Sequence, residues 1–508
     1  MMTVLRISMF IFLITVLVAF ILMKIVRWYF FRTRRMRLLQ DLNIPGPRPH
    51  FIFGHMKEYN STPNVIWDSE MIDKYGPICG YYIGAKPVIL IADPNLANQI
   101  RNFEERPRRV PGGINPDPMR AKMLGNLSVE KWKRLRAILN KSFSSNMIKS
   151  FTPTVARIVE QELMDAIRAQ HSAEVNIYPL LQNFTFELIS QTGFGVHANF
   201  SGNSDLRAAV EEEFSKNASN SWLTQLFLCF PDMTILQRIR IWHQWMKIKL
   251  GTSKSTELRN FCESVQQERL RSRSRSRDIL QVMLDSEIQD DDEKVLANSI
   301  LFYEAAFETL SAGLAFTIHL LTNNEQAQRI VRDEIRGHLQ ENEGRICADR
   351  ISNLKYLDLV IKESLRMYPP QTTFISRSGE RDLDYKNEDG QIHTIPKGVH
   401  LQICLYQMHH SSKFWDNPEM FRPDRHLDEQ KHPDYDVVFQ PFGKGKRRCI
   451  GYSYAKFVMP FVLATILSQY TFSQSPKTEE TIEVLFKTAT MTPKNGCFAE
   501  INFDPIAF

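Results

Sequence analysis

A ten-residue segment near the C-terminus, residues 442–451, constrains this chain more than any other feature. It reads Phe-Gly-Lys-Gly-Lys-Arg-Arg-Cys-Ile-Gly and places Cys449 among basic residues and glycines. Glycine accepts backbone conformations that other residues resist, so Gly443, Gly445 and Gly451 let the chain turn tightly and approach a flat ligand. A metal-bound thiolate needs such a setting, with backbone N–H groups directed at the sulfur. For this composition, the core of the pattern has a chance expectation on the order of 10⁻⁴.

The remaining cysteines offer no competing metal centre. The seven cysteines are scattered from Cys79 to Cys497, without a CxxC pair or a zinc-ligand spacing. This distribution argues against a disulfide framework and is typical of a reducing compartment. A single cysteine is usually an inert core residue. The pattern around Cys449 favours a metal-bound thiolate instead.

The N-terminus differs in character from the rest of the chain. Residues 7–23 are apolar except for Ser8 and Thr15, and a span of ~20 residues is enough for one bilayer crossing. Six basic residues follow within residues 24–37 and only Arg6 precedes, so the positive-inside rule places the following chain in the cytosol. A cleaved signal peptide would carry its charge in front of a shorter apolar run. We therefore expect residues 1–38 to be an uncleaved transmembrane anchor with a basic juxtamembrane segment.

Residues 39–508 are predicted to form one large cytosolic domain. The chain has 508 residues, of which 43% are apolar, and no Gly/Ser/Pro-rich linker divides it. Helical patterning dominates from about residue 127 to 370, with Ser128 predicted as an N-cap, and residues 295–323 should cross the core because they are apolar nearly all round. Short apolar runs at 87–91 and 399–403 predict strands. The predicted fold class is mainly α (α+β), a helical body with small peripheral β-sheets.

Charge argues against a nucleic-acid partner. Lys and Arg number 63 against 57 Asp and Glu, a net charge of +6, which is small for such a chain. An arginine-serine tract at 271–277 resembles an RNA-binding segment, but it is only seven residues long. We interpret it as a solvated loop that is open to phosphorylation.

At residues 442–451 the sequence resembles the haem-thiolate monooxygenases, the cytochrome P-450 superfamily, and the resemblance extends through most of the chain. It implies the cytochrome P-450 fold and haem b as cofactor, with Cys449 as the thiolate ligand of the iron. Phe442 would pack against the porphyrin, and Arg447 would pair with a propionate. The resemblance implies three further residues that donate hydrogen bonds to the propionates: Trp132, Arg136 and Arg377. The alignment at Arg377 is ambiguous by one residue.

Two more motifs match the superfamily in the right order. Glu363 and Arg366 are three residues apart on one helix face, where they can pair. The resemblance implies a buried structural triad completed by Arg425, with Asp424 at a position where glutamate is more common. Such a cluster collapses when one member is lost.

The segment 305–309 lies inside the long apolar helix and contains an acid beside a threonine. Burying an acid in an apolar core costs free energy unless the acid is solvated or has a function. The alternative to a functional role is that this face of the helix is turned to solvent. The resemblance implies that Thr309 orients oxygen on the iron and that Glu308 helps to deliver protons through water. Ala306 stands where glycine is commoner and Leu310 where a hydroxyl is common, and Leu310 would alter the water chain.

The resemblance also implies a small apolar substrate and an external source of electrons. No G-x-G-x-x-G or flavin module is found, so NADPH would act only indirectly, through a membrane-bound flavoprotein reductase. Within the superfamily, residues 278–281, 301–335 and 356–360 most resemble the clan of xenobiotic oxidases and thromboxane synthase. We expect a monomer in the endoplasmic reticulum membrane, single-pass, with the catalytic domain in the cytosol. The predicted pocket residues are Phe302, Ala305, Ala306, Phe307, Thr372, Phe374, Ile375 and Met491.

Three functions stay open at this stage. The first is an oxygen-inserting monooxygenase acting on a lipid, steroid or xenobiotic. The second is a haem-thiolate isomerase or dehydratase that rearranges a lipid peroxide without external electrons, which has no need for the Glu308–Thr309 relay. The third is a non-catalytic membrane-tethered binding protein, which leaves Cys449 and Thr309 unexplained.

Overall fold

The protein is described here by a computed structural model. It describes residues 2–104, 119–170, 174–199, 256–272, 275–286, 291–372, 375–386, 390, 392–427, 433–487 and 490–507, with scattered residues between 202 and 246. The α-helices are α1 (Met2–Asp41), α2 (Met56–Ser61), α3 (Asn64–Tyr75), α4 (Pro94–Ile100), α5 (Val129–Asn140), α6 (Ser145–Ile158), α7 (Met164–Arg168), α8 (Ile177–Phe194), α12 (Thr256–Ser272), α13 (Ile279–Leu284), α14 (Asp292–Thr322), α15 (Glu325–Glu341), α16 (Lys355–Met367), α17 (Leu405–His409), α18 (Tyr435–Val438) and α19 (Tyr452–Gln469). A π-helical turn, η4 (Val159–Leu163), joins α6 to α7, and the 3₁₀ turns are η1 (Arg120–Lys122), η2 (Leu124–Asn126), η3 (Lys141–Phe143), η5 (Ala348–Asn353), η6 (Pro423–His426) and η8 (Gly445–Arg447).

The strands form small separate sheets among the described residues. The largest has the order β1-β2-β7-β4, with β2 and β7 parallel and the other pairs antiparallel. The others have the orders β3-β11-β8, β10-β9 and β5-β6. The strands are β1 (Ile78–Ile83), β2 (Lys86–Ile91), β3 (Glu174–Asn176), β4 (Ser376–Ser378), β5 (Leu383–Lys386), β6 (Ile392–Ile395), β7 (His400–Ile403), β8 (Tyr470–Ser473), β9 (Val484–Phe486), β10 (Met491–Pro493) and β11 (Phe498–Phe503).

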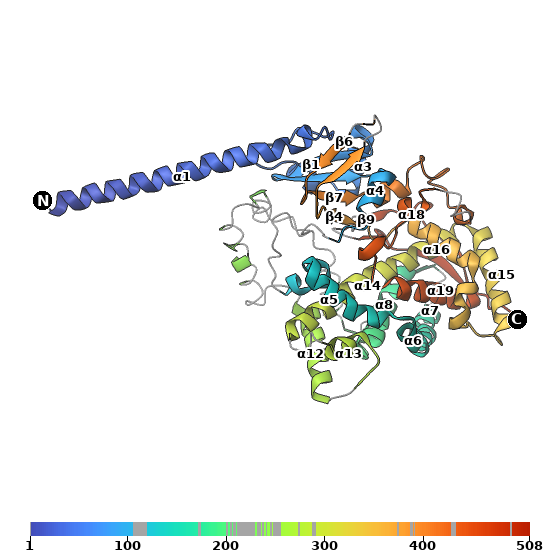
Figure 1. Cartoon of the computed structure of the whole chain (residues 1–508). Coiled ribbons are helices and arrows are strands. Elements are labelled where there is room, and N and C mark those ends of the chain that lie inside the picture. The colour runs from blue at the N-terminus through green and yellow to red at the C-terminus, as the bar shows by residue number, and fades with distance from the viewer. Residues whose placement is uncertain are drawn as a thin grey trace.

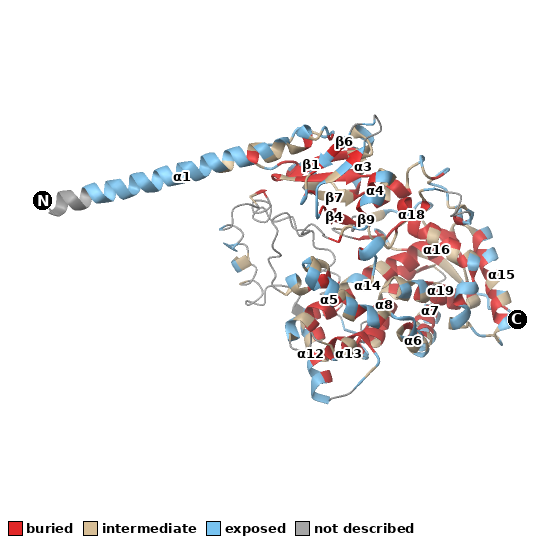
Figure 2. Ribbon diagram, viewed as in Figure 1, coloured by how far each residue is buried: buried red, intermediate tan, exposed pale blue. Residues whose placement is uncertain are grey.

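Helix α1 stands apart from the helical body as one long projecting helix (Figure 1). Its apolar part is exposed along its length (Figure 2). Among the residues that the structure describes, two helices are long and apolar enough to cross a membrane: α1 over Ser8–Asp41, and α14, which is mostly buried inside the domain. Burial of α14 identifies it as a core helix, and the exposed surface of α1 fits the predicted anchor.

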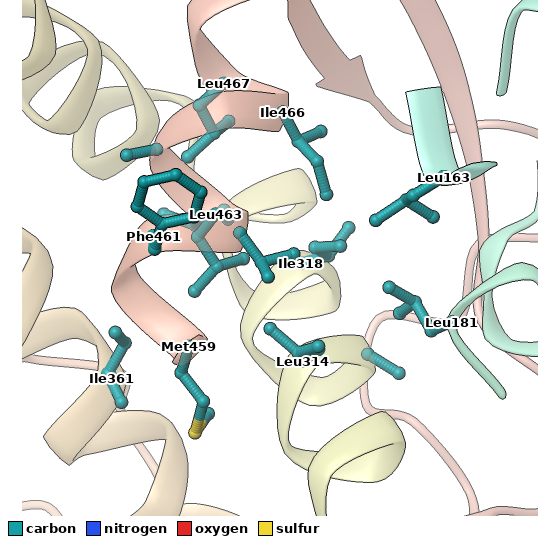
Figure 3. Close-up of a cluster of buried hydrophobic side chains, with 14 of the residues drawn as sticks. Leu163, Leu181, Leu314, Ile318, Ile361, Met459, Phe461, Leu463, Ile466 and Leu467 are labelled. Carbon is teal, nitrogen blue, oxygen red and sulfur yellow. The ribbon is translucent and has the colours of Figure 1, made fainter. Parts of the chain in front are cut away.

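The main core lies where α14, α16 and α19 pack together (Figure 3). Leu314 and Ile318 of α14 meet Leu463 and Ile466 of α19, and all four are fully buried. Dense packing of this kind holds an apolar helix in one position. The elements that carry the site described below are therefore attached to rigid supports.

The predicted mainly α fold is confirmed, as are both predicted strands, which correspond to β2 and β7. The long apolar segment forms α14 and runs through the core. Ser128 precedes α5 as predicted, but its side chain makes no capping hydrogen bond. Part of the arginine-serine tract, residues 273 and 274, lies outside the described residues.

Candidate active site

One face of α14 is open to solvent in the middle of an otherwise buried helix. Between residues 295 and 322 all residues are buried except five, which we call the accessible window: Leu301, Glu304, Ala305, Ala306 and Thr309. At about 100° per residue, the five positions lie within about 100° of Ala305 around the helix axis. Solvent reaches this face although both ends of the segment are enclosed. The window is therefore a solvent-accessible face in the middle of a core helix.

The segment 442–451 folds into a tight loop that presents Cys449. Gly443 and Gly445 have φ values of 68° and 72°, a region that favours glycine. A Cβ atom on Gly445 would lie only 2.6 Å from the carbonyl oxygen of Arg101. The N–H of Cys449 donates to the carbonyl oxygen of Phe442 at 2.8 Å and closes the loop. These glycines allow the close approach that the sequence predicts.

The thiol of Cys449 lies deep in the protein, yet solvent reaches it. Burial raises the pKa of this thiol, while the backbone N–H of Gly451 and the charges of Arg136 and Arg448 act in the opposite direction. The other cysteines are buried, apart from the half-buried Cys347. Solvent access leaves the sulfur open to a ligand. Nearby N–H groups and cations are the surroundings that stabilise a thiolate ligand.

Arg377 and Arg447 are buried cations that form no ion pair among the described residues. Arg377, on β4, donates to the carbonyl oxygen of Ser376 at 2.9 Å, and its buried Nε has no hydrogen-bond partner. Arg447 donates to the carbonyl oxygen of Glu104 at 2.7 Å and lies over the ring of Trp132, 3.7 Å from its centroid. Burial lowers the pKa of Arg377 to about 10, and burial together with repulsion from Arg377 lowers that of Arg447 to about 10.

A third arginine, Arg136 on α5, contributes to the same repulsion at Arg447. It donates to the carbonyl oxygen of Arg448 at 2.7 Å and to the side chain of Asn140 at 3.1 Å. We call Arg136, Arg377 and Arg447 the arginine cluster.

Cations held together in this way are stable when an anion compensates them. The two carboxylates of haem are such anions, and its iron needs an axial ligand. The accessible thiol and the unpartnered Nε of Arg377 therefore fit a haem group.

The acid and the threonine predicted for proton transfer point to different partners. Thr309, in the window, donates from its hydroxyl to the carbonyl oxygen of Ala305 at 2.7 Å. Glu308 is buried, and its carboxylate accepts from Lys487 and Thr490, which lie between β9 and β10. Lys487 was not predicted from the sequence, because only the fold brings residues 179 positions apart into contact.

The predicted pocket residues divide between the window and the core. Ala305 and Ala306 belong to the window, whereas Phe307 is buried and packs against Phe186 of α8, with 5.8 Å between ring centroids. Two residues turn a helix by about 200°, so Phe307 faces away from Ala305. The structure thus places Phe307 in the packing between α14 and α8, and its role as a pocket residue stays a prediction.

The other predicted pocket residues are all buried where the structure describes them. Phe302 packs on Phe143, with centroids 5.8 Å apart, and Ile375 reaches towards Gly443 of the Cys449 loop. Met491 and Thr372 are also buried, and Met491 belongs to the main core. Phe374 lies outside the described residues.

Glu363 is the centre of a second charged group, in which the structure brings the three predicted triad residues together. Its carboxylate accepts two bonds from Arg366, both at 2.9 Å, and one from Arg425 at 2.8 Å. His426 adds a fourth contact at 2.9 Å. We call Glu363, Arg366, Arg425 and His426 the Glu363 cluster. These contacts outweigh the cost of burial and lower the pKa of Glu363 to about 2.

The sequence offered no reason to select His426 or Glu104. The only hint in the sequence is that His426 directly follows Arg425, a residue of the predicted triad. Glu104 binds Lys446 at 2.6 Å and Lys133 at 2.5 Å. It thereby neutralises two of the basic residues near the Cys449 loop, and no sequence signal marks it.

Comparisons with known proteins agree with this geometry. A profile of the family described as Cytochrome P450 matches residues 44–498. Lithocholate 6-beta-hydroxylase of Mesocricetus auratus is 27% identical over 497 residues, covering 93% of this chain and 94% of that protein. Cytochrome P450 3A5 of Homo sapiens is 28% identical over 476 residues (90% and 90%). Thromboxane-A synthase of Rattus norvegicus is 25% identical over 537 residues (96% and 97%).

Proposed function

The chain belongs to the cytochrome P450 family, and we propose that it is a membrane-anchored monooxygenase that inserts one oxygen atom from O₂ into an apolar organic substrate. The observation that carries this proposal is the accessible thiol of Cys449 in a domain whose central helix has a solvent-accessible face at Thr309. Relatives named as a hydroxylase and as a thromboxane synthase fit an enzyme that acts on lipid-like molecules.

The protein's part is to hold haem b and to exclude competing ligands. Cys449 would bind the iron, Phe442 would pack beside the porphyrin, and the arginine cluster with Trp132 would bind the propionates. With a thiolate ligand, haem supplies the chemistry that cleaves the O–O bond. Because Gly445 has no Cβ, the loop can pack closely against the backbone of Arg101, and the N–H of Cys449 closes the loop on Phe442.

Two side chains on α14 would handle protons. The Thr309 hydroxyl donates its hydrogen to the carbonyl oxygen of Ala305, so its oxygen can accept a hydrogen bond from water. To pass a proton on, the hydroxyl would have to turn away from that carbonyl. Glu308 is held by Lys487 and Thr490. Its proposed role in proton delivery therefore requires the carboxylate to leave these partners during turnover.

Electrons would come from NADPH through a flavoprotein reductase that docks on the Cys449 side. Six basic residues of α5 and the Cys449 loop are candidates for contact with an acidic partner: Lys131, Lys133, Arg134, Lys444, Lys446 and Arg448. Lys133 and Lys446 are paired with Glu104, and Lys444 is paired with Asp436. The cationic surface available to an acidic partner is thus smaller than the sequence suggests. Its remaining basic residues are Lys131, Arg134 and Arg448.

The anchor is proposed to place the enzyme in the endoplasmic reticulum membrane with the catalytic domain in the cytosol. Arg32, near the end of α1, is buried against the domain, donating to the carbonyl oxygens of Phe51 at 2.6 Å and Cys229 at 2.9 Å. The exposed apolar part of α1 precedes this contact. Deletion of residues 1–38 should release the chain from microsomes at least in part; full retention in the microsomal lumen would contradict this topology.

The test of the proposal uses the purified, full-length chain with haem. The reduced protein under carbon monoxide should show the Soret band of thiolate ligation, and Cys449→Ser should abolish it. Cys347→Ser, which changes the half-buried cysteine, is the matched control and should keep the band. A band typical of imidazole ligation, or an unchanged band in Cys449→Ser, would contradict the proposal.

A second measurement separates oxygen insertion from peroxide rearrangement. With reductase, NADPH and ¹⁸O₂, the product should gain one labelled oxygen atom, and Thr309→Ala should consume NADPH with little product. Turnover of a lipid hydroperoxide without NADPH, and no incorporation from ¹⁸O₂, would favour the isomerase instead.

A further inference from the structure

The arginine-serine tract at 271–277 is a sequence motif that the proposed function does not use. It alternates arginine and serine at seven successive positions and joins α12 to α13. Arg271, Arg275 and Arg277 are exposed, and none of the three forms an ion pair among the described residues. The tract therefore presents cations that the fold does not neutralise and that an acidic partner can recognise.

Ser276 lies between two of these exposed arginines, and its own side chain is half-buried against the domain. Gly195, which directly follows α8, marks its surroundings: a Cβ atom on Gly195 would lie 3.4 Å from the hydroxyl oxygen of Ser276. The same point is 2.9 Å from Nη2 of Arg269 and 2.8 Å from Oδ2 of Asp278. The three atoms thus lie around one point. A group added to the hydroxyl of Ser276 is placed beside both charged side chains.

Arg269 and Asp278 form a balanced ion pair that connects three helices. Arg269 Nη2 lies 2.8 Å from Asp278 Oδ2, and the two side chains are 7% and 2% exposed. Arg269 also donates to the carbonyl oxygen of Phe194, at the end of α8, at 2.8 Å. Asp278 accepts from the N–H of Gln281, in the first turn of α13, at 2.8 Å. The pair therefore attaches α12 to α8 and to α13, with one cation facing one anion.

We propose that Ser276 is a phosphorylation site, modified by a serine kinase that recognises arginine on both sides of its target. An acidic substrate groove in such a kinase is complementary to Arg275 and Arg277. The hydroxyl oxygen of Ser276 attacks the γ-phosphorus of ATP, the bond from this phosphorus to the oxygen of ADP breaks, and the serine proton passes to a base of the kinase. The products are phosphoserine and ADP. The inference goes beyond the oxidation chemistry and rests only on the proposed cytosolic placement of the domain, where ATP and kinases are present.

Phosphorylation of Ser276 changes the charge balance at the ion pair of Arg269 and Asp278. At pH 7 the phosphate adds roughly 1.5 to 2 negative charges, next to a carboxylate that is almost fully buried. It repels Asp278 and competes with it for Arg269. Both effects weaken the contacts of α12 with α8 and α13. The modification therefore lowers the stability of this part of the domain without changing a residue of the proposed haem site.

The first test uses the purified, full-length, haem-loaded chain with ATP and a serine–arginine protein kinase, and mass spectrometry locates the phosphate. Ser276 should be phosphorylated in the wild type. The double variant Arg275→Gln with Arg277→Gln should lower the rate of phosphate incorporation at Ser276 at least about tenfold. Arg329→Gln, at an exposed arginine of α15, is the matched control and should keep the wild-type rate. Phosphate at other serines but none at Ser276, or an unchanged rate in the double variant, would overturn the inference.

A second measurement tests the effect on the ion pair, with Ser276→Ala as the control that kinase and ATP should leave unchanged. Phosphorylation should lower the melting temperature of the wild type by at least about 1 °C. In Asp278→Asn the asparagine can still cap α13, and the phosphate becomes the anion that balances Arg269, so phosphorylation should raise the melting temperature. A fall in both proteins, or no shift in the wild type, would contradict the proposed effect.

If Asp278→Asn does not fold, amide hydrogen exchange in the wild type decides. The N–H of Gln281, which bonds to Asp278, should exchange faster after phosphorylation, and an unchanged rate would contradict the proposed effect. Because these tests use purified protein, they do not depend on the topology or on the substrate. Loss of the thiolate-type Soret band contradicts the proposed function alone, whereas a normal band without phosphate at Ser276 contradicts this inference alone.

Discussion

The Glu363 cluster and the arginine cluster both bury guanidinium groups, but only the first contains the acid that balances them. Glu363 accepts from Arg366, Arg425 and His426, all at 2.8 to 2.9 Å. In the arginine cluster, Arg377 has a buried Nε without a partner, and Arg447 is repelled by its neighbours. A balanced cluster serves the fold by itself, whereas an unbalanced cluster becomes complete when an anionic ligand binds. The comparison therefore supports a structural role for the Glu363 cluster and the proposed propionate-binding role for the arginine cluster.

The largest expected effect comes from removing the acid of the balanced cluster. Glu363→Gln leaves Arg366 and Arg425 buried without their anion, so the free energy of unfolding should fall by about 4 kcal/mol. Urea denaturation of the haem-loaded protein measures it. Glu325→Gln makes the same chemical change in an exposed ion pair and should cost less than about 1 kcal/mol. Equal effects of the two substitutions would contradict the assignment of the Glu363 cluster as a structural element of the fold.

Acid should weaken the balanced cluster in a defined pH range. The pKa of Glu363 is lowered from 4.5 to about 2, so its stabilising effect is complete above pH 4.5 and is lost as the pH falls towards 2. This lowering of the pKa corresponds to about 3 kcal/mol in the free energy of unfolding. Burial lowers the pKa of His426, which acts in the same direction below pH 6.5. Denaturation curves between pH 7 and pH 3 should show this loss in the wild type and a smaller one in Glu363→Gln.

The unbalanced cluster should respond in the opposite way. Arg377→Met removes a buried cation that has no acidic partner, so the stability of the haem-free protein should stay the same or rise. Haem should dissociate roughly 10- to 100-fold faster, because about 1.5–3 kcal/mol of charged hydrogen bonding is lost. Transfer of haem to excess apomyoglobin measures the rate. Arg329→Met, at an exposed arginine, is the control; an unchanged rate in Arg377→Met would contradict the assignment of the cluster to the propionates.

The smallest effect is expected at His426. His426→Asn removes the hydrogen bonds to Glu363 at 2.9 Å and to the hydroxyl of Tyr435 at 2.7 Å, while both arginines of the Glu363 cluster remain. The free energy of unfolding should fall by about 1 kcal/mol, as measured by urea denaturation at pH 7. A loss as large as that in Glu363→Gln would show that the histidine, and not the charge balance, holds the cluster together.

Much of the architecture was predictable because it depends on local patterns. The apolar helix α14 and the strands β2 and β7 appear where periodicity placed them. Side-chain capping by Ser128 failed, because capping depends on the orientation of a hydroxyl that periodicity does not encode. The contact of Phe307 with α8 could not be predicted for a similar reason, since the segment 302–309 shows which residues are apolar and not which face meets α8.

The site was predictable only where a motif is contiguous. Residues 442–451 contain their own glycines and their own cysteine, so the loop around Cys449 was expected from sequence. Lys487 and Arg120 could not be found in that way, since each meets α14 across 179 or 184 residues of chain. Nothing in the sequence around Glu304 marked it before the structure showed its ion pair with Arg120.

Composition, apolar periodicity and short motifs by themselves determined the helical class, an N-terminal apolar segment long enough for a membrane span, and the choice of Cys449, because each of these is a property of neighbouring residues. Only the tertiary structure decided which cations are balanced by acids and which face of α14 is open. It also decided that Glu308 binds Lys487 and that Arg120 meets Glu304. The physical reason is that burial and electrostatic pairing depend on distances between segments far apart in the chain, and packing of the whole domain sets those distances.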